Sequence, residues 1–477
     1  MSTTKPLLKN ESGVDEVSFA GTDHIQTPTY SPEIKSYEDL FVLLKYGKAL
    51  DDGAPITVPG HSWRSIRSEP KFKDFTSQIE SLVRDHPIIY REPVELFRYR
   101  RPQRLVSYGL AGGSSRSFYK KLRNEEYDQA IEMLPEFFQP FLEAQMERLL
   151  EVKEYAIPER FDNTLRTATE GWHDKRANKG WPNYFASIAK DAQKSPDAGV
   201  VPPVPPVTRG SSQQDIDRAM GANQGMVNTC REVNAGHFGS IVYPYLHVYA
   251  DYSVLKDGTR NDRKILESVR QEIRDREAES SFTDIGNGGI SYYGVVLTLS
   301  GVSKAWDSGL SVRLERFVSE LENVASSFDL PLLMSRTTWH GLYLTDYGVK
   351  TFSSLLNGNE NYSQRGSGIG KEAKYGTTPF YGKALDLPIS EAFTAIQNQG
   401  GSVHPISGLP DQPTSYDPTA SSWEGRVGTD KEYRVDFGKA RRLVHAQEAR
   451  EVREGRRRGT SKPAKQYLRR SEHNDFS

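Results

Sequence analysis

The chain has 477 residues, a formal net charge of −1 and a hydrophobic fraction of 36%. This length suggests two or three domains and allows a sizeable core, while the near-neutral charge gives the whole molecule no general affinity for polyanions. The single cysteine, Cys230, excludes an intramolecular disulfide framework, as is typical of a reducing compartment. No apolar run is long enough to span a membrane and no signal-peptide core is present, so we expect a soluble, intracellular protein with no membrane partner.

The first 212 residues divide into three segments by composition. Residues 1–36 are rich in Ser, Thr, Pro and charge and lack periodicity, which predicts a flexible N-terminal arm, either a disordered leader or an arm that packs onto a neighbouring subunit. Residues 37–194 are expected to be a helical region, with helices over residues 37–50 and from Lys71 onwards. Residues 195–212 are expected to be a Pro-rich linker, because consecutive prolines require extended backbone.

Residues 213–399 form the predicted central α/β domain. After a helix over residues 213–232, the pattern predicts strands over 241–254 and 290–299, helices over 262–279 and 309–328, and paired strands over 332–335 and 342–345 that lead into 349–356. The helices carry apolar residues on one face only, as expected of helices laid on a sheet. We therefore assign the chain to a helix-rich α+β class, with a small α/β unit at about residues 239–356, a helical N-terminal region and long irregular loops.

The C-terminal part of the chain is first irregular and then basic. Residues 400–430 are expected to be an irregular loop, and residues 431–477 a basic tail. Between Arg441 and Arg470 there are eleven Lys or Arg and three acidic residues, a local excess of +8, so the rest of the chain sums to −9. A basic tail on an acidic body can hold nucleic acid by charge without reading its sequence. The candidate nucleic-acid-binding residues are Arg441, Arg442, Arg456, Arg457, Arg458, Lys462, Lys465, Arg469 and Arg470.

A second basic stretch lies in residues 87–104, where aromatic residues alternate with arginines. This pattern is compatible with nucleic-acid binding by phosphate pairing and base stacking. The favoured alternative is an Arg-rich face packed over aromatics, or an Arg-rich subunit interface.

Catalytic and cofactor motifs of high specificity are absent from the sequence, so we expect no cofactor and no metal. Residues 366–371 approach a phosphate loop, but Arg365 stands where the first glycine is required and Glu372 replaces the hydroxyl. His247 lies in a predicted strand and His340 in a predicted aromatic hairpin, and neither has a partner that the sequence identifies. Both patterns favour packing roles.

One set of carboxylates could converge as a two-metal nuclease requires. Asp251 ends a predicted strand, while Asp257 and Asp284 lie in turns near it. Turns also favour Asp for backbone hydrogen bonding, which is the alternative interpretation of these three residues.

The segment Trp339-x-Gly341-Leu342-x-Leu344-x-x-Tyr347-Gly348-Val349, together with the size and helix-rich layout, resembles capsid proteins of small double-stranded RNA viruses of plants and fungi, the partitivirus type. The resemblance concerns the layout of most of the chain and does not extend to the basic C-terminus. It implies a mostly helical shell subunit that dimerises and builds an icosahedral particle around RNA. It implies no active-site residues.

Three hypotheses follow from the sequence. The favoured one is a self-assembling structural protein, a viral coat protein that encloses RNA as a large homo-oligomer and resides in the virion or host cytoplasm. The second is a nucleic-acid-processing enzyme, a metal-dependent nuclease or replication protein, that uses Asp251, Asp257 and Asp284. The third is an adaptor that binds nucleic acid through its basic tail.

Overall fold

The computed structural model describes residues 5–10, 14–58, 63, 75–91, 121, 124, 126–132, 188–195, 198–204, 206–235, 240–256, 260–282, 291–337, 339–356, 424–426, 434–436 and 443–459. Among these residues, no helix is both long enough and apolar enough to cross a membrane.

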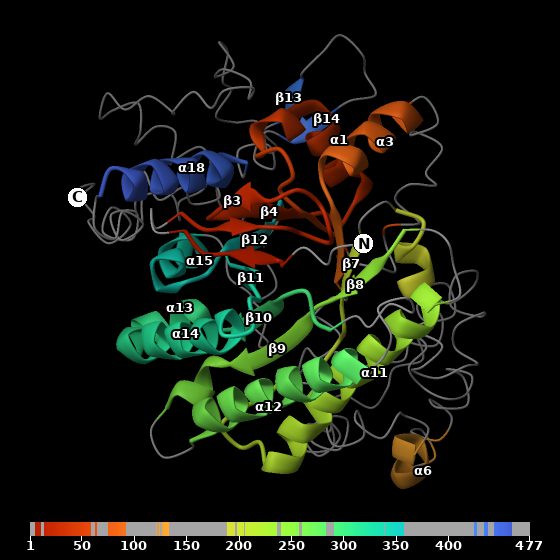
Figure 1. Ribbon diagram of the computed structural model, residues 1–477, viewed down its shortest axis with the longest axis vertical. Coiled ribbons are helices and arrows are strands. Elements are labelled where there is room, and N and C mark those ends of the chain that lie inside the picture. Colours follow the sequence, from red (N-terminus) through yellow and green to blue (C-terminus); the bar gives the residue numbers. More distant parts are fainter. Residues whose placement is uncertain are drawn as a thin grey trace.

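A large parallel sheet lies at the centre of the molecule (Figure 1). Its strands, in spatial order, are β8 (Val242–Pro244), β7 (Ala198–Val201), β6 (Ile88–Arg91), β5 (Ile56–Val58), β4 (Thr29–Glu33), β12 (Thr351–Leu355), β11 (Leu332–Ser335), β10 (Val295–Ser300) and β9 (Leu246–Asp251). Every strand runs parallel to its neighbours. Strands that follow one another in the chain therefore lie side by side, and β12 returns to pair with β4.

The two outermost strands of this sheet are consecutive in the chain, so the sheet closes on itself. Only Tyr245 separates β8 from β9, and its N–H donates to the Val200 carbonyl of β7 at 2.9 Å. Beyond β7 the chain continues beside β9: Val207 N donates to Tyr249 O at 2.9 Å, and Asp251 N donates to Val207 O at 2.8 Å. Thus β8 and β9 act as one strand between β7 and β10. The result is a closed parallel barrel with eight strand positions, the (β/α)8 architecture.

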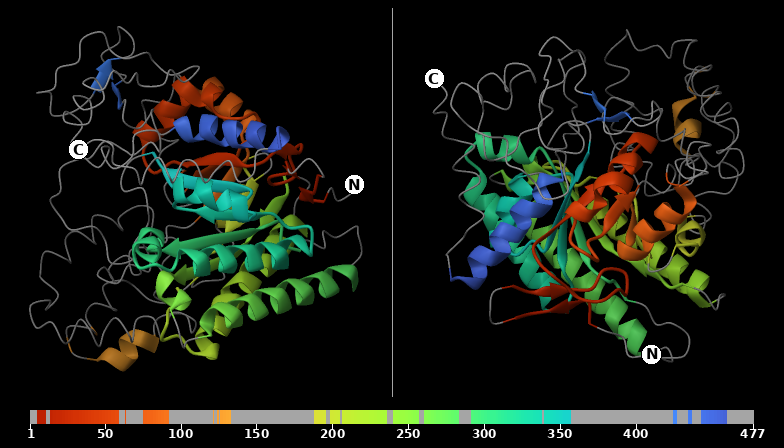
Figure 2. Two further views of the ribbon diagram at one scale, coloured as in Figure 1. Left: turned by 90° about the vertical axis from the view of Figure 1, so that its left-hand side faces the viewer. Right: turned by 90° about the horizontal axis from the view of Figure 1, so that it is seen from above.

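Helices follow the strands and cover the outside of the barrel (Figures 1 and 2). They are α1 (Tyr37–Tyr46) after β4, α3 (Thr76–Asp85) after β5, α11 (Gln213–Ala235) after β7, α12 (Asn261–Phe282) after β9, α13 (Val302–Asp307) and α14 (Ser311–Ser326) after β10, α15 (Trp339–Leu344) after β11, and α18 (Val444–Arg457) after β12. Each longer helix has an apolar face that packs inwards. On α14, Leu314, Phe317, Leu321 and Val324 are buried, at the spacing that the sequence predicts.

A small antiparallel sheet plugs the N-terminal end of the barrel. It consists of β1 (Leu7–Leu8), β2 (Glu16–Val17) and β3 (Ile25–Gln26). Phe19, which follows β2, packs with inward-facing Tyr245 in one apolar cluster. The backbone N–H of Ala20 donates to the Tyr245 hydroxyl at 3.2 Å. The N-terminal segment therefore closes one end of the barrel interior.

Two glycines make room for the Tyr245 ring inside the barrel. A Cβ atom at Gly199 would lie 2.5 Å from a ring carbon, and one at Gly294 would lie 2.9 Å from two of them. Real Cβ atoms do not approach so closely, so any side chain at either position would displace the ring. Because Tyr245 separates β8 from β9, these glycines support the closure of the sheet.

The α/β class is confirmed, but the sheet is much larger than the small unit predicted at residues 239–356. It extends in the chain from Thr29 to Leu355, so the α+β, helix-rich assignment is replaced by one continuous parallel barrel. The first strands were not expected because they lack the apolar runs typical of buried strands. Thr29–Glu33 contains three polar residues and a proline, and Ile56–Val58 has only three residues.

Three shorter segments also differ from expectation. The sequence predicts an arm at residues 1–36, but the described part forms β1 to β4. It predicts a linker at residues 195–212, but these residues supply β7 and its extension beside β9. The strand predicted over residues 342–345 is wrong: residues 339–344 form helix α15, because three apolar residues in a row do not distinguish a strand from a buried helix. Of residues 357–443, the structure describes only β13 (Glu424–Arg426), β14 (Arg434–Asp436) and Leu443.

Candidate active site at the C-terminal end of the barrel

The inward-facing side chains change from apolar to polar along the barrel axis. Val296 and Leu333 belong to the apolar cluster around Tyr245. Two residues further along the same strands, Thr298 and Ser335 lie opposite each other and carry hydroxyl groups. The same change occurs from Ile89 to Arg91 and from Tyr245 to His247, because side chains two residues apart on a strand lie on the same face. We name one group of these side chains the polar mouth: Glu33, Arg91, His247, Thr298, Ser335 and Arg336.

Three charged side chains of the polar mouth form a buried ionic cluster. The Arg336 Nε donates to Glu33 Oε2 at 2.8 Å, and its Nη2 lies 2.6 Å from Oε1. Arg91 Nη2 donates to the same Oε2 atom. The exposed fractions of the Glu33, Arg91 and Arg336 side chains are 1%, 2% and 4%. One carboxylate is thus held between two guanidiniums, and the Arg336 contact uses the fork geometry that arginine offers to carboxylates and phosphates.

The backbone of Arg336 is strained. It follows β11 directly and has a φ of +59°, in the left-handed region that non-glycine residues seldom adopt. Ser353 fixes this conformation from β12: its Oγ accepts from Arg336 N at 3.4 Å, and its carbonyl accepts from Thr337 N at 2.7 Å. Strain of this kind costs on the order of 1–3 kcal/mol and clusters at functional sites. Here it aims the guanidinium at Glu33.

A directed hydrogen-bond chain runs beside the ionic cluster. His247 Nδ1 lies 2.7 Å from the Pro202 carbonyl oxygen, so Nδ1 carries the proton. Nε2 then accepts from Thr298 Oγ1 at 2.9 Å, and Thr298 Oγ1 accepts from Ser335 Oγ at 2.5 Å. Burial lowers the pKa of His247 to about 3; the hydrogen bond to Pro202 opposes this effect and the charge of Arg91 adds to it. His247 is therefore neutral, and its role is to orient the two hydroxyls.

A small cavity lies inside the barrel next to these groups. Its volume is about 20 Å³, enough for a water molecule or a monatomic ion. It is lined by Ser31, Thr57, Ile89, Arg91, Val201, Val296, Leu333, Met334, Ser335, Thr351 and Ser353. The Thr351 hydroxyl is buried and has no hydrogen-bond partner. The cavity thus combines a hydroxyl-rich wall with one guanidinium.

The carboxylates expected for a two-metal centre do not form a described cluster. Asp251 ends β9, and its Oδ1 accepts from Ser253 N at 3.0 Å, so it caps the short helix Tyr252–Leu255. Asp257 and Asp284 lie outside the described residues. Within the described part of the chain, no three His, Cys, Asp or Glu side chains are placed to hold a metal ion. His340 is buried with its ring 5.9 Å from that of Trp306, the aromatic packing that the sequence favours.

The basic tail begins as a barrel helix. Helix α18 contacts β4 and α15 and buries Ala446, Ala449 and Val452. Of the candidate nucleic-acid-binding residues, Arg456 pairs with Asp346 at 3.2 Å, Arg457 pairs with Glu454, and Arg458 is exposed. The others, Arg441, Arg442, Lys462, Lys465, Arg469 and Arg470, lie outside the described residues.

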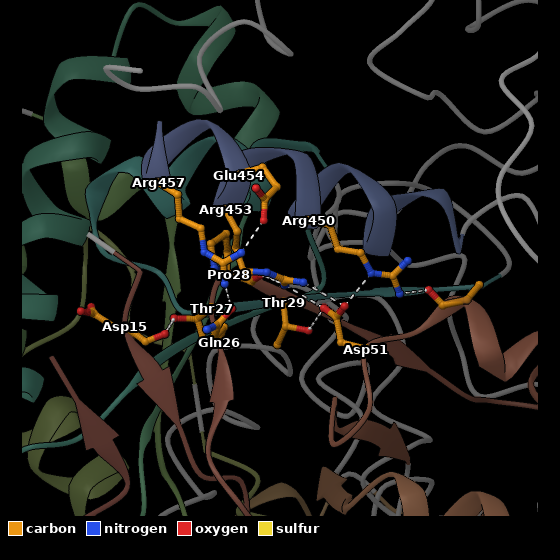
Figure 3. Close-up of polar contacts among 11 residues, drawn as sticks. Asp15, Gln26, Thr27, Pro28, Thr29, Asp51, Arg450, Arg453, Glu454 and Arg457 are labelled. Carbon is orange, nitrogen blue, oxygen red and sulfur yellow. Dashed lines mark hydrogen bonds and ion pairs between the residues drawn. The ribbon is translucent and has the colours of Figure 1, made fainter. Parts of the chain in front are cut away.

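Helix α18 is clamped to the barrel through Asp51 (Figure 3). Arg450 Nε lies 2.6 Å from Asp51 Oδ1, and Arg453 donates to both carboxylate oxygens at 2.8 and 2.9 Å. Arg453 also donates to the Pro28 carbonyl at 2.6 Å. Burial raises the pKa of Asp51, but the hydrogen bonds and charges of Arg453 and Arg450 outweigh it and hold the pKa below its usual value. These two arginines therefore stabilise the fold.

The sequence did not single out the residues of the ionic cluster. Arg91 lies in the basic stretch of residues 87–104, which the sequence links to nucleic acid or packing. Glu33 falls in the expected arm and Arg336 after a predicted strand. The three come together only when the barrel closes, and local periodicity carries no signal for that. No protein-family model matches the sequence, and a search of curated proteins finds no significant match.

Proposed function

We propose that the protein is an enzyme whose active site includes the polar mouth and whose substrate carries an anionic oxygen group, a phosphate or a carboxylate. The observation that carries this proposal is the buried Glu33 carboxylate between Arg91 and Arg336 at the C-terminal end of the barrel. In barrels of this architecture the catalytic groups gather at that end of the strands.

The energetics support a functional reason for this cluster. Burying ions costs several kcal/mol each, and apolar replacements of similar volume are often neutral or stabilising. The protein nevertheless buries three charges and adds backbone strain at Arg336. A barrel built only for packing gains nothing from this arrangement.

The geometry suggests a role for each group. Glu33 orients Arg336 and Arg91, whose guanidiniums supply charge-assisted hydrogen bonds to a substrate oxyanion. The His247–Thr298 chain fixes the Ser335 proton towards Thr298, so the Ser335 oxygen presents lone pairs inside the barrel. Phosphodiesters belong to this substrate class, so a nucleic-acid-processing enzyme is one form of the proposal.

The experiment is a substrate screen with the full chain. Phosphomonoesters, phosphodiesters including short RNA and DNA, and carboxylate esters are tested for turnover and for a shift in melting temperature. We expect a member of the panel to be turned over by the wild type and to lose turnover at least roughly 100-fold in Arg336→Lys, which keeps the charge but not the fork. Asp51→Asn is the matched control, since it breaks an ion-pair cluster outside the barrel interior.

Two outcomes would count against this proposal. One is a panel without turnover or thermal shift; the other is equal loss in Arg336→Lys and Asp51→Asn. The coat-protein hypothesis stays a prediction, and it leads to a different result. Size-exclusion chromatography and electron microscopy would then show a megadalton particle containing nucleic acid. The enzyme proposal expects a monomer or small oligomer.

A further inference from the structure

The direction of the hydrogen-bond chain from Pro202 to Ser335 determines what Ser335 can bind. The Pro202 carbonyl can only accept, so His247 Nδ1 carries the proton, and burial keeps the imidazole neutral. Nε2 therefore accepts from Thr298, and the Thr298 oxygen accepts the only proton of Ser335. Among the described residues, no donor reaches the Ser335 oxygen. This hydroxyl group is thus available as an acceptor only.

Ser335 lines the small cavity inside the barrel together with a second hydroxyl group. The cavity volume of about 20 Å³ is enough for one water molecule or for one hydroxyl group of a ligand. Thr351 also lines it, and the Thr351 hydroxyl is buried without a hydrogen-bond partner. The cavity therefore offers one incoming group an acceptor at Ser335 and a donor at Thr351.

A hydroxyl group matches this lining better than other small polar groups do. It donates one hydrogen bond, as the Ser335 oxygen requires, and it accepts one from Thr351. An ionised carboxylate or phosphate oxygen has no proton to donate. An ammonium group donates but cannot accept, and the cavity lining contains the Arg91 guanidinium and no carboxylate. Each unmatched buried polar group is costly, so the lining selects for a group that both donates and accepts.

We propose that the substrate of the polar mouth carries a hydroxyl group beside its anionic group, and that this hydroxyl binds in the cavity against Ser335 and Thr351. The inference rests on the proposed function, because the anionic group is the one expected at Arg91 and Arg336. Arg91 belongs both to the cavity lining and to the ionic cluster, so the two binding positions are adjacent. The substrate class is thus a hydroxylated organic anion, such as a hydroxy acid or a phosphate ester of a polyol.

The test uses the full chain and two pairs of ligands: glycolate with fluoroacetate, and hydroxyethyl phosphate with fluoroethyl phosphate. In each pair, fluorine replaces the hydroxyl group at similar size and removes its proton. Titration calorimetry should give a dissociation constant at least roughly tenfold lower for the hydroxyl member, because the fluoro analogue leaves the Ser335 oxygen without a donor.

Two serine variants locate the origin of this preference. Ser335→Ala removes the acceptor, so it should bind both members of a pair with equal affinity. Ser354→Ala is the matched control, because the Ser354 hydroxyl is also buried but pairs with Tyr30 and does not line the cavity. It should keep the wild-type preference for the hydroxyl member.

The wild-type result separates this inference from the proposed function. If both members of each pair bind with the same affinity, the anion site stands and the hydroxyl inference is overturned. If neither member of either pair binds, the anion site of the proposed function fails and the inference fails with it. A preference that survives in Ser335→Ala, or that is lost equally in Ser335→Ala and Ser354→Ala, would also overturn the inference.

Discussion

Single residues in this barrel take their chemistry from burial. His247 is completely buried and neutral, so it works as a fixed acceptor and donor and not as a proton shuttle. Its Nδ1 proton is committed to Pro202, and that commitment sets the direction of the bonds through Thr298 to Ser335. If His247 were protonated, its Nε2 would donate a hydrogen bond, and the Thr298 hydroxyl would have to accept it in place of donating. Burial therefore preserves one hydrogen-bond pattern over the physiological pH range.

This environment predicts a pH dependence of stability. The pKa of His247 is about 3 in the folded protein and about 6.5 when unfolded, so the unfolded state binds more protons between these values. The contribution of His247 to the free energy of unfolding is thus fully present above about pH 6.5. It falls by about 1.4 kcal/mol per pH unit as the pH drops from 6.5 towards 3. In urea unfolding, His247→Gln should lose about 2 kcal/mol less than the wild type between pH 7 and pH 5. Equal losses would contradict the assignment.

The ionic cluster predicts strong coupling between Glu33 and Arg336. Either Glu33→Gln or Arg336→Gln leaves buried charge without its partner and should cost about 3–5 kcal/mol of unfolding free energy. The double variant should cost less than the sum by at least about 1 kcal/mol, because the two groups share one interaction. Urea denaturation of the four proteins measures this difference. Additive costs would show that the two side chains act independently.

At the scale of elements, prediction from sequence worked where one face is apolar over several turns. The helices expected over residues 213–232, 262–279 and 309–328 are α11, α12 and α14, within a few residues. Strands whose inward side chains are polar were not predicted, as β4 shows with Ser31 and Glu33 facing the barrel interior. The closure of the sheet could not be predicted either, because the pairing of β12 with β4 joins residues more than 300 positions apart in the chain. The ionic cluster could not be predicted for the same reason, since Glu33 and Arg336 are also far apart in the chain.

Helix α18 illustrates how one carboxylate anchors an element. Asp51→Asn removes the charge that holds Arg450 and Arg453, and charge-assisted hydrogen bonds of this kind contribute about 2 kcal/mol. Hydrogen–deuterium exchange of residues 444–457 should therefore accelerate at least roughly tenfold, while exchange in β9 and β10 stays unchanged. Glu454→Gln is the control, since its pair with Arg457 is largely exposed. A similar acceleration in both variants would show that Asp51 has no specific role in holding α18 on the barrel.

At the scale of the whole molecule, both ends of the described chain are parts of the barrel. The residues before β4 plug its N-terminal end, and α18 occupies the helix position between α15 and α1 (Figure 2). The segments after β6 and β12, the longest between consecutive strands, both leave the barrel at its C-terminal end, because that is where parallel strands of this order end. The N-terminal plug thus leaves the C-terminal end, where the polar mouth lies, as the end at which we propose that substrate binds.

The position of α18 sharpens the test of the basic tail. A chain that stops after Ala440 loses α18, which exposes Tyr30 and Phe352 and leaves Asp51 buried without its arginines, so it should melt far below the wild type or fail to fold. A chain that stops after Gly459 keeps α18 and should melt like the wild type. It lacks Lys462, Lys465, Arg469 and Arg470, so if the tail binds duplex nucleic acid, the slope of log K against log salt should fall by about 3–4. Unchanged affinity and slope would exclude these four residues from binding, and unchanged melting after the longer truncation would contradict the role of α18 in the barrel.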